Sequence, residues 1–226
     1  MKTCGFVSIL SFALASGAAH AEGCDSLPLP SVTLKRFEVP VTTNFEYGYR
    51  TLTNIGAALA DGQRFVLGLT RGNAVVKVEF KAPGFIDRSG RYECLSPQLT
   101  LSYGFSPMTV YVAREFPAGT CAYKQIYEHE LRHVRTYLAH LVAIEPEIAA
   151  VLNQRFATGA PWRGPVGQTQ GRLQKELEER WIPYLQREIN RVNADQRLID
   201  TPEEYERVSN SCNGEISKRL AQKASR

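Results

Sequence analysis

The sequence predicts an α+β protein, in which an antiparallel β-rich half precedes a helical half. Apolar and polar residues alternate through much of residues 64–112, whereas from Thr120 onward the apolar residues recur with the period of a helix. Strands and helices separated in this way along the chain are typical of α+β proteins. The 226 residues, 43% hydrophobic and 22% charged, suit one globular domain. We expect that domain to span residues 22–226, with a β-rich part at 22–117 and a helical part at 118–226.

The first 21 residues have the features of a signal peptide. Lys2 supplies a positive charge, residues 6–14 form a short apolar run, and Ala19-His20-Ala21 is a small-residue cleavage site. That run is too short to cross a bilayer, and no later stretch approaches about 18 uninterrupted apolar residues. We therefore expect a periplasmic or secreted protein with no integral membrane segment after cleavage.

The cysteine count agrees with export. Cleavage would remove Cys4 and leave an even number of cysteines, which predicts two disulfides in an oxidising compartment. Four cysteines allow three pairings, and the sequence does not choose among them. The four are Cys24, Cys94, Cys121 and Cys212.

The strands are predicted by alternation with a period of two, with glycine and proline in the turns between them. Leu52–Leu59 could form one short helix within this half. The expected strands are Val76–Phe80, Leu99–Phe105, Met108–Val112 and Arg64–Thr70, with a less regular one at Val32–Val41.

The helical half begins with Thr120 as an N-cap and a helix from Cys121 to about Glu145, where Pro146 ends or kinks it. A short helix to about Phe156 follows, and 157–171 is rich in Gly, Pro and polar residues, as in a surface loop. The remaining signals predict a long helix over Leu173–Arg197 with a kink at Pro183, and a last helix with Thr201 as N-cap, Pro202 at its first position and Glu204 completing a capping box.

The motif that carries chemistry is His129-Glu130-Leu131-Arg132-His133, an HExxH pattern. On a helix the two histidines lie one turn apart on one face, so both can bind a single Zn²⁺ while the glutamate polarises a water. At 100° per residue, Glu130 falls within the apolar face of its helix. A lone buried carboxylate is costly unless it is paired or faces a metal, so a catalytic role for Glu130 explains its position better than solvation does. The alternative is an accidental HExxH whose histidines are polar core residues.

The third zinc ligand is expected to be a carboxylate on a later helix. The one other histidine of the mature chain, His140, lies about 10 Å along the helix from His133, which favours a structural role. In the predicted helix over Leu173–Arg197, Glu188 falls inside the apolar stripe, and antiparallel pairing would bring the later half of that helix level with the motif. Glu188 is the preferred ligand, and Glu178 and Asp195 remain possible.

These residues resemble the zincin metallopeptidases through His129, Glu130 and His133. Positions 136 and 139 hold Thr and Ala, where the metzincin pattern has glycine and histidine, so that subclass is disfavoured. The layout of signal peptide, β-rich half, Cys121 before the motif helix and helical C-terminal half is similar to uncharacterised secreted bacterial proteins described as zinc-dependent proteases. The resemblance implies a zincin-like fold, zinc-dependent peptidase activity and a periplasmic setting.

The resemblance also suggests where a substrate would bind. In zincins a strand before the active-site helix commonly pairs with extended substrate, and here Leu99–Phe105 or Met108–Ala113 would be that edge. Four tyrosines could contact substrate, although core or surface roles are favoured for each. They are Tyr103, Tyr111, Tyr184 and Tyr205.

The leading hypothesis is an exported zinc metallopeptidase in which Glu130 acts as general base on a zinc-activated water and then protonates the leaving amine. Its partner would be a peptide or protein substrate. The net charge of +4 is mild and not gathered into a basic stripe, so nucleic acid is not an expected partner. The alternatives are a non-catalytic envelope binding protein with a structural or vestigial zinc site, and a zinc amidase acting on cell-wall peptide.

Overall fold

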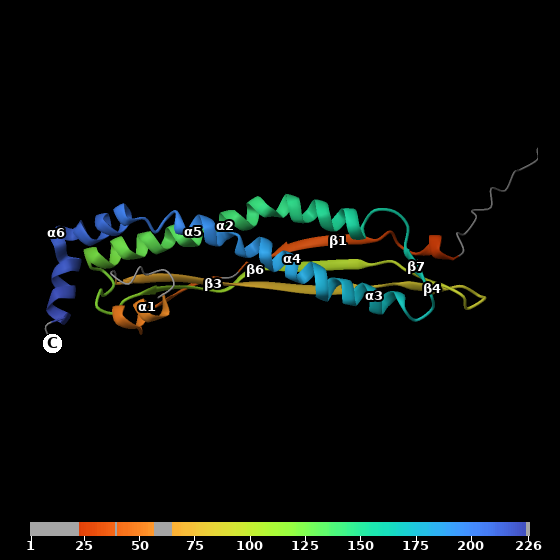
Figure 1. Ribbon diagram of the computed structural model, residues 1–226, viewed down its shortest axis with the longest axis horizontal. Helices are drawn as coiled ribbons and strands as arrows, with labels where there is room; N and C mark the ends of the chain where they lie inside the picture. The colour runs from red at the N-terminus through yellow and green to blue at the C-terminus, as the bar shows by residue number, and fades with distance from the viewer. Residues whose placement is uncertain (1–22, 39, 57–64, 225–226) are drawn as a thin grey trace, which may run out of the picture.

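The computed structural model describes residues 23–38, 40–56 and 65–224, so the predicted signal peptide lies outside the described residues. The molecule is elongated, with a long helix lying along a sheet and shorter helices returning beside it (Figure 1). The elements follow in the order η1 (Cys24–Ser26), β1 (Ser31–Arg36), β2 (Val41–Asn44), α1 (Tyr49–Ile55), β3 (Gly68–Lys81), β4 (Gly84–Ile86), β5 (Glu93–Leu95), β6 (Gln98–Val112), α2 (Cys121–Phe156), β7 (Trp162–Gly164), α3 (Thr169–Glu176), the π-helical turn η2 (Leu177–Trp181), α4 (Ile182–Asn190), α5 (Val192–Arg197) and α6 (Pro202–Ala224).

The α+β class is confirmed, but the prediction of an antiparallel sheet is wrong for half of the main sheet. Strand β6 lies at its centre and pairs antiparallel with β3 along nearly its whole length. On its other side β6 pairs in parallel with β1 and then with β2. Alternation of apolar residues shows which face of a strand is buried and says nothing of the direction of its neighbour, so the sequence pattern could not separate the two arrangements.

Strand β6 joins two predicted strands into one. The buried residues of its first part have odd numbers up to Phe105, and those of its second part have even numbers from Met108. Between these positions β6 carries one residue more than β3, whose register shifts between Gly72 and Ala74. A β-bulge of this kind keeps one face of a strand buried although its alternation changes phase.

Helix α2 is also longer than predicted, because Pro146 does not end it. The helix continues through Pro146 to Phe156, and Ile144, Ile148 and Leu152 are buried on both sides of the proline. Proline removes one backbone donor, and burial of this apolar face on the sheet offsets that loss. The segment predicted as one helix over Leu173–Arg197 is instead α3, η2, α4 and α5 in succession. The predicted helix at Leu52–Leu59 is α1 at Tyr49–Ile55, and residues 57–59 lie outside the described part of the chain.

Two disulfides form, as predicted, and the structure supplies the pairing that the sequence left open. Cys24 is bonded to Cys94, and Cys121 to Cys212. Both bonds fit an extracytoplasmic protein, since disulfides persist in oxidising compartments. In the part of the chain that the structure describes, no helix has the length and apolar character needed to cross a bilayer.

A small second sheet of β4, β5 and β7 lies at the end of the molecule away from α6 (Figure 1). Its Glu93 is only 7% exposed and accepts three backbone hydrogen bonds, from the N–H groups of Gly167 (2.9 Å), Gln168 (3.1 Å) and Thr169 (2.8 Å). These N–H groups precede or begin α3, where a helix leaves its first donors unpaired. The hydrogen bonds lower the pKa of Glu93, so the ionised carboxylate stabilises the junction.

We predict that Glu93→Gln lowers the free energy of unfolding at pH 7 by about 1–3 kcal/mol, because the amide replaces a charged acceptor. The pKa of Glu93 is lowered in the folded state, so this stabilisation exists above the ordinary carboxyl pKa of 4.5 and disappears as the pH falls through the folded value. Urea unfolding from pH 7 to pH 3 measures it. Glu79→Gln, on the exposed side of β3, is the matched control; a difference from wild type that is constant with pH would contradict the assignment.

Candidate metal centre

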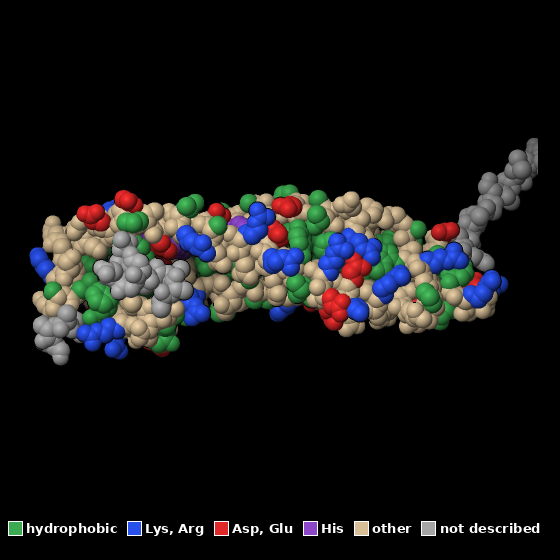
Figure 2. Space-filling view, in the orientation of Figure 1, with side chains coloured by type: hydrophobic (Ala, Val, Ile, Leu, Met, Phe, Trp, Pro, Cys, Tyr) green, Lys and Arg blue, Asp and Glu red, His purple; other side chains and the backbone are tan. Residues whose placement is uncertain are grey.

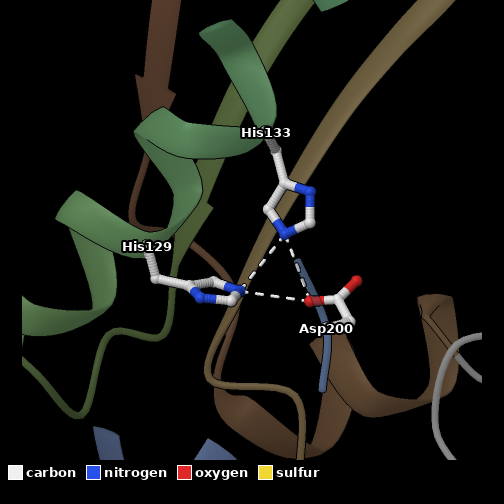
Figure 3. Close-up of side chains that lie close together, drawn as sticks. All are labelled: His129, His133 and Asp200. Atoms are coloured by element: carbon white, nitrogen blue, oxygen red, sulfur yellow. Dashed lines mark hydrogen bonds and ion pairs between the residues drawn. The ribbon is translucent and has the colours of Figure 1, made fainter. Parts of the chain in front are cut away.

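The two motif histidines lie buried at the side of α2 that faces away from solvent. His129 and His133 are 9% and 8% exposed, and their rings meet edge to face with centroids 4.9 Å apart. Both rings point toward the segment that joins α5 to α6, which contributes Asp200 (Figure 3). The helix therefore presents its polar residues to a second part of the chain rather than to water.

The three side chains bring one ligand atom each to a common point. His129 Nε2 and His133 Nε2 are 3.2 Å apart, and each lies 3.2 Å from Asp200 Oδ1. Ligands about 2.0–2.1 Å from a tetrahedral metal ion lie about 3.3 Å from one another, so the triangle has the size of one face of such a site. The group His129, His133 and Asp200 could hold a metal ion.

The outer nitrogens of both rings have partners, and for His133 the partner leaves the inner nitrogen as an acceptor. Gln196 Nε2 donates to the carbonyl of His133, so its Oε1 is oriented to accept from His133 Nδ1 at 2.6 Å. His129 Nδ1 lies 3.2 Å from Glu204 Oε1 and 2.8 Å from the Arg132 guanidinium, which can only donate. A cation bound at this point would satisfy both Nε2 lone pairs and the Asp200 carboxylate, in place of the hydrogen bonds that the rings otherwise donate to Asp200.

The charges around the group agree with this arrangement. Burial raises the pKa of Asp200, but hydrogen bonds from His129 and His133 outweigh it and hold the pKa well below its usual range. The Arg207 guanidinium, which donates to Glu204 at 2.8 Å, lowers the pKa of Glu204 to about 2. Arg132 also donates to Glu204. Both carboxylates are therefore ionised at neutral pH.

Glu130 is 3% exposed and turns toward β3. Thr70 Oγ1 donates to Glu130 Oε2 at 2.8 Å, and a Cβ built on Gly68 would lie 2.5 Å from Glu130 Oε1. Gly68 is thus required for the carboxylate to lie where it does. Burial raises the pKa of Glu130, while the nearby His133 and His129 act in the opposite direction. The prediction that this acid lies on the buried face of its helix is confirmed.

The metal centre and Glu130 line one pocket of about 790 Å³. The pocket lies between β3 and the helices α4 to α6, with α2 as its floor. Figure 1 shows α5 and the first part of α6 beside α2, with β3 below them, and Figure 2 shows Lys and Arg side chains spread along the same face. Among the described residues β3 pairs with β6 alone, so its other edge has no strand partner.

Glu188, the third ligand that the sequence pattern favoured, lies elsewhere. Its carboxylate is paired with Arg191 at 2.7 Å, and its carbonyl accepts from His140 Nε2 at 2.9 Å. The other two candidates are also engaged away from the centre: Asp195 lies 3.9 Å from His140 Nδ1, and Glu178 accepts from Gln174 at 2.8 Å. Asp200 takes the place for which these three were considered.

The expected antiparallel arrangement of this segment beside α2 is present, but in a different register. Glu188 is level with His140, Gln196 with His133, and Asp200 with both motif histidines. The π-helical turn η2 and the break between α4 and α5 change the phase on which the choice of Glu188 depended. The available signal was the capping box: Thr201 accepts from the N–H of Glu204 at 3.2 Å, so Asp200 directly precedes a fixed helix start.

The tyrosines divide between the core and the pocket. Tyr103 is buried and donates to Glu145 at 2.6 Å, Tyr111 stacks on Tyr47, and Tyr184 packs edge to face on Trp181. Tyr205 lines the pocket, 6.4 Å from the ring of His129. Tyr137 also lines it, and sequence reasoning did not select that residue as functional.

No protein-family model matches the chain, and neither a curated protein nor a solved structure matches it.

Asp200→Asn should weaken zinc binding by more than about 100-fold, because losing a ligand costs more than the 10–100-fold typical of an outer hydrogen-bond partner. Glu188→Gln is the matched control and should bind zinc as wild type does, because its carboxylate pairs with Arg191. Competition with a chelating dye measures both constants. Loss of binding in Glu188→Gln with retention in Asp200→Asn would reverse the assignment of the third ligand.

Proposed function

We propose that this protein is an exported, zinc-dependent metallopeptidase of zincin type, acting in the periplasm or outside the cell. The observation that carries the proposal is the triangle of two imidazole nitrogens and one carboxylate oxygen at 3.2 Å, beside a buried glutamate that follows the first histidine. Three protein ligands with an open fourth position are typical of catalytic zinc sites, whereas structural sites usually have four.

Zinc is the metal that this ligand set favours. Two histidines and one carboxylate supply nitrogen and oxygen donors, and their spacing suits four-coordinate tetrahedral geometry. Calcium and magnesium prefer six or more oxygen ligands, which the group does not offer. When bound, zinc would supply the positive charge that polarises a scissile carbonyl and makes a water more acidic.

Glu130 would act as the proton carrier. Its carboxylate shares the pocket with the centre, and its hydrogen bond from Thr70 fixes one oxygen while the other remains for a water. As general base it would take a proton from the attacking water and then give it to the leaving amine. The apolar surroundings that raise its pKa favour a group that gains and loses a proton during turnover.

The free edge of β3, rather than β6, is suited to hold an extended peptide. The N–H of Ala113 donates to the carbonyl of Leu67 at 2.8 Å, which makes them a hydrogen-bonded antiparallel pair. The backbone groups of Gly68, Thr70 and Gly72 consequently point away from β6, toward the pocket. The edges expected at Leu99–Phe105 and Met108–Ala113 belong to β6 or follow it, and β6 is paired on both sides.

Glu130→Gln should retain zinc and reduce kcat for peptide hydrolysis by at least about 100-fold, since the amide cannot accept the proton. Glu128→Gln, two residues away on the exposed face, is the control and should keep full activity. The measurements are zinc content and turnover of an unbiased peptide library. Full zinc content without wild-type turnover would favour the non-catalytic binding protein, and turnover of peptidoglycan peptides alone would favour the cell-wall amidase.

Gly68→Ala should reduce kcat about tenfold or more while zinc affinity stays within about twofold, because the new Cβ displaces Glu130 and no ligand touches Gly68. Gly171→Ala, where a Cβ meets nothing within 4 Å, is the control. Kinetics and dye competition on both variants decide the matter. Unchanged kcat in a folded Gly68→Ala protein would show that the observed place of Glu130 is not the catalytic one.

A further inference from the structure

The pocket that contains the metal centre has two chemically different ends. Toward α1 and α6 its lining includes the apolar side chains of Ile55, Phe65 and Leu220 and, on α6, the carboxylate of Glu204. Toward α4 and α5 it is polar and positively charged, with Arg71 on β3, Arg197 on α5 and the amide side chain of Asn193. Arg71 is the neighbour of Thr70, so this end begins one residue along β3 from the strand position that bonds Glu130.

The arginines of this region fall into two groups by their partners. Arg132 and Arg207 donate to Glu204, and Arg191 is paired with Glu188. Arg71 and Arg197, by contrast, are exposed and form no hydrogen bond or ion pair with another described residue. The acids that line the same pocket have partners of their own: Thr70 for Glu130, the histidines for Asp200 and the two arginines for Glu204.

We propose that Arg71 and Arg197 form an anionic-side-chain subsite, so that the substrate is a peptide with an aspartate or glutamate close to one side of the bond that is cleaved. This inference rests on the proposed peptidase function and specifies its substrate class. A guanidinium offers donors in a planar fork that suits a carboxylate, and such a charge-assisted pair is strongest where water is partly excluded. The two arginines come from different elements, β3 and α5, and line the same pocket as the edge of β3 on which the peptide would lie.

The geometry limits the acid to one side of the scissile bond. An extended peptide advances about 3.3 Å per residue, and a long arginine side chain that begins beside Thr70 reaches an acid within a few residues of the reacting carbonyl. On the other side of that carbonyl the peptide meets the end with Ile55, Phe65, Leu220 and the ionised Glu204, which offers a substrate carboxylate no cationic partner. Substrates should therefore be asymmetric, with an acidic residue on one side and an apolar residue on the other.

The test separates binding from cleavage. Zinc-loaded Glu130→Gln protein is immobilised and incubated with libraries of ten-residue peptides, each of which has one glutamate, placed in turn at every position. Matched libraries have glutamine in its place. Mass spectrometry of the retained peptides gives the enrichment. We expect about tenfold enrichment of glutamate over glutamine at positions confined to one side, with the preference reduced by 0.5 M salt. Arg71→Gln and Arg197→Gln, each combined with Glu130→Gln, should each lower it severalfold.

The control is Arg187→Gln, which removes the same charge from α4 outside the pocket and should leave the enrichment unchanged. Equal retention of glutamate and glutamine peptides, retention of neither, or a preference that survives both arginine substitutions would overturn the subsite. Cleavage by the wild-type enzyme is measured on the same libraries. Hydrolysis without an acidic preference overturns the subsite alone, whereas an arginine-dependent acidic preference in binding, without hydrolysis by wild type, overturns the peptidase function alone.

Discussion

The structure depends on how a helix lies on a sheet while three of its polar side chains are buried there. His129, Glu130 and His133 are all under 10% exposed, and each would be costly in an apolar interface without a partner. Each partner comes from a different part of the chain. Thr70 on β3 bonds Glu130, Gln196 on α5 bonds His133, and Asp200 contacts both histidines. The need to satisfy these groups fixes the segments around α2.

The covalent structure supports the same arrangement. Cys121 is the first residue of α2, and Cys212 lies where the backbone of α6 leaves helical geometry, so their disulfide ties the end of the site segment to the start of the motif helix. Closing a loop of about this length stabilises a folded chain by about 4–5 kcal/mol in the chain-entropy account. Arg207, which donates to both Gln125 and Glu204, makes a further link between α2 and α6. Asp200 is therefore held between two fixed points rather than in a free loop.

The sequence predicted what depends on local pattern and missed what depends on distant registration. The helical phase of residues 129–133 put both histidines on one side and Glu130 on the buried face, because one regular helix fixes those directions. The N-cap at Thr201 was predicted for the same reason and is present. The choice of a third candidate ligand depended on the register of two segments about 70 residues apart. The π-helical turn changes that register, and Glu188 lies level with His140 rather than with the motif. The parallel pairing of β1 and β2 with β6 was equally beyond local pattern.

The role of β3 shows why the motif alone does not define the site. The five-residue motif supplies two candidate metal ligands and an acid, but the position of that acid is set by Thr70, which bonds it, and by Gly68, which leaves room for it. The same two residues direct their backbone groups to the unpaired edge of the sheet. A peptide lying on that edge would therefore be aligned by the strand that also positions Glu130. Its reacting carbonyl and Glu130, the proposed proton carrier, would then both be positioned by β3. Catalysis gains most from orientation when the reacting groups are held rigidly relative to each other.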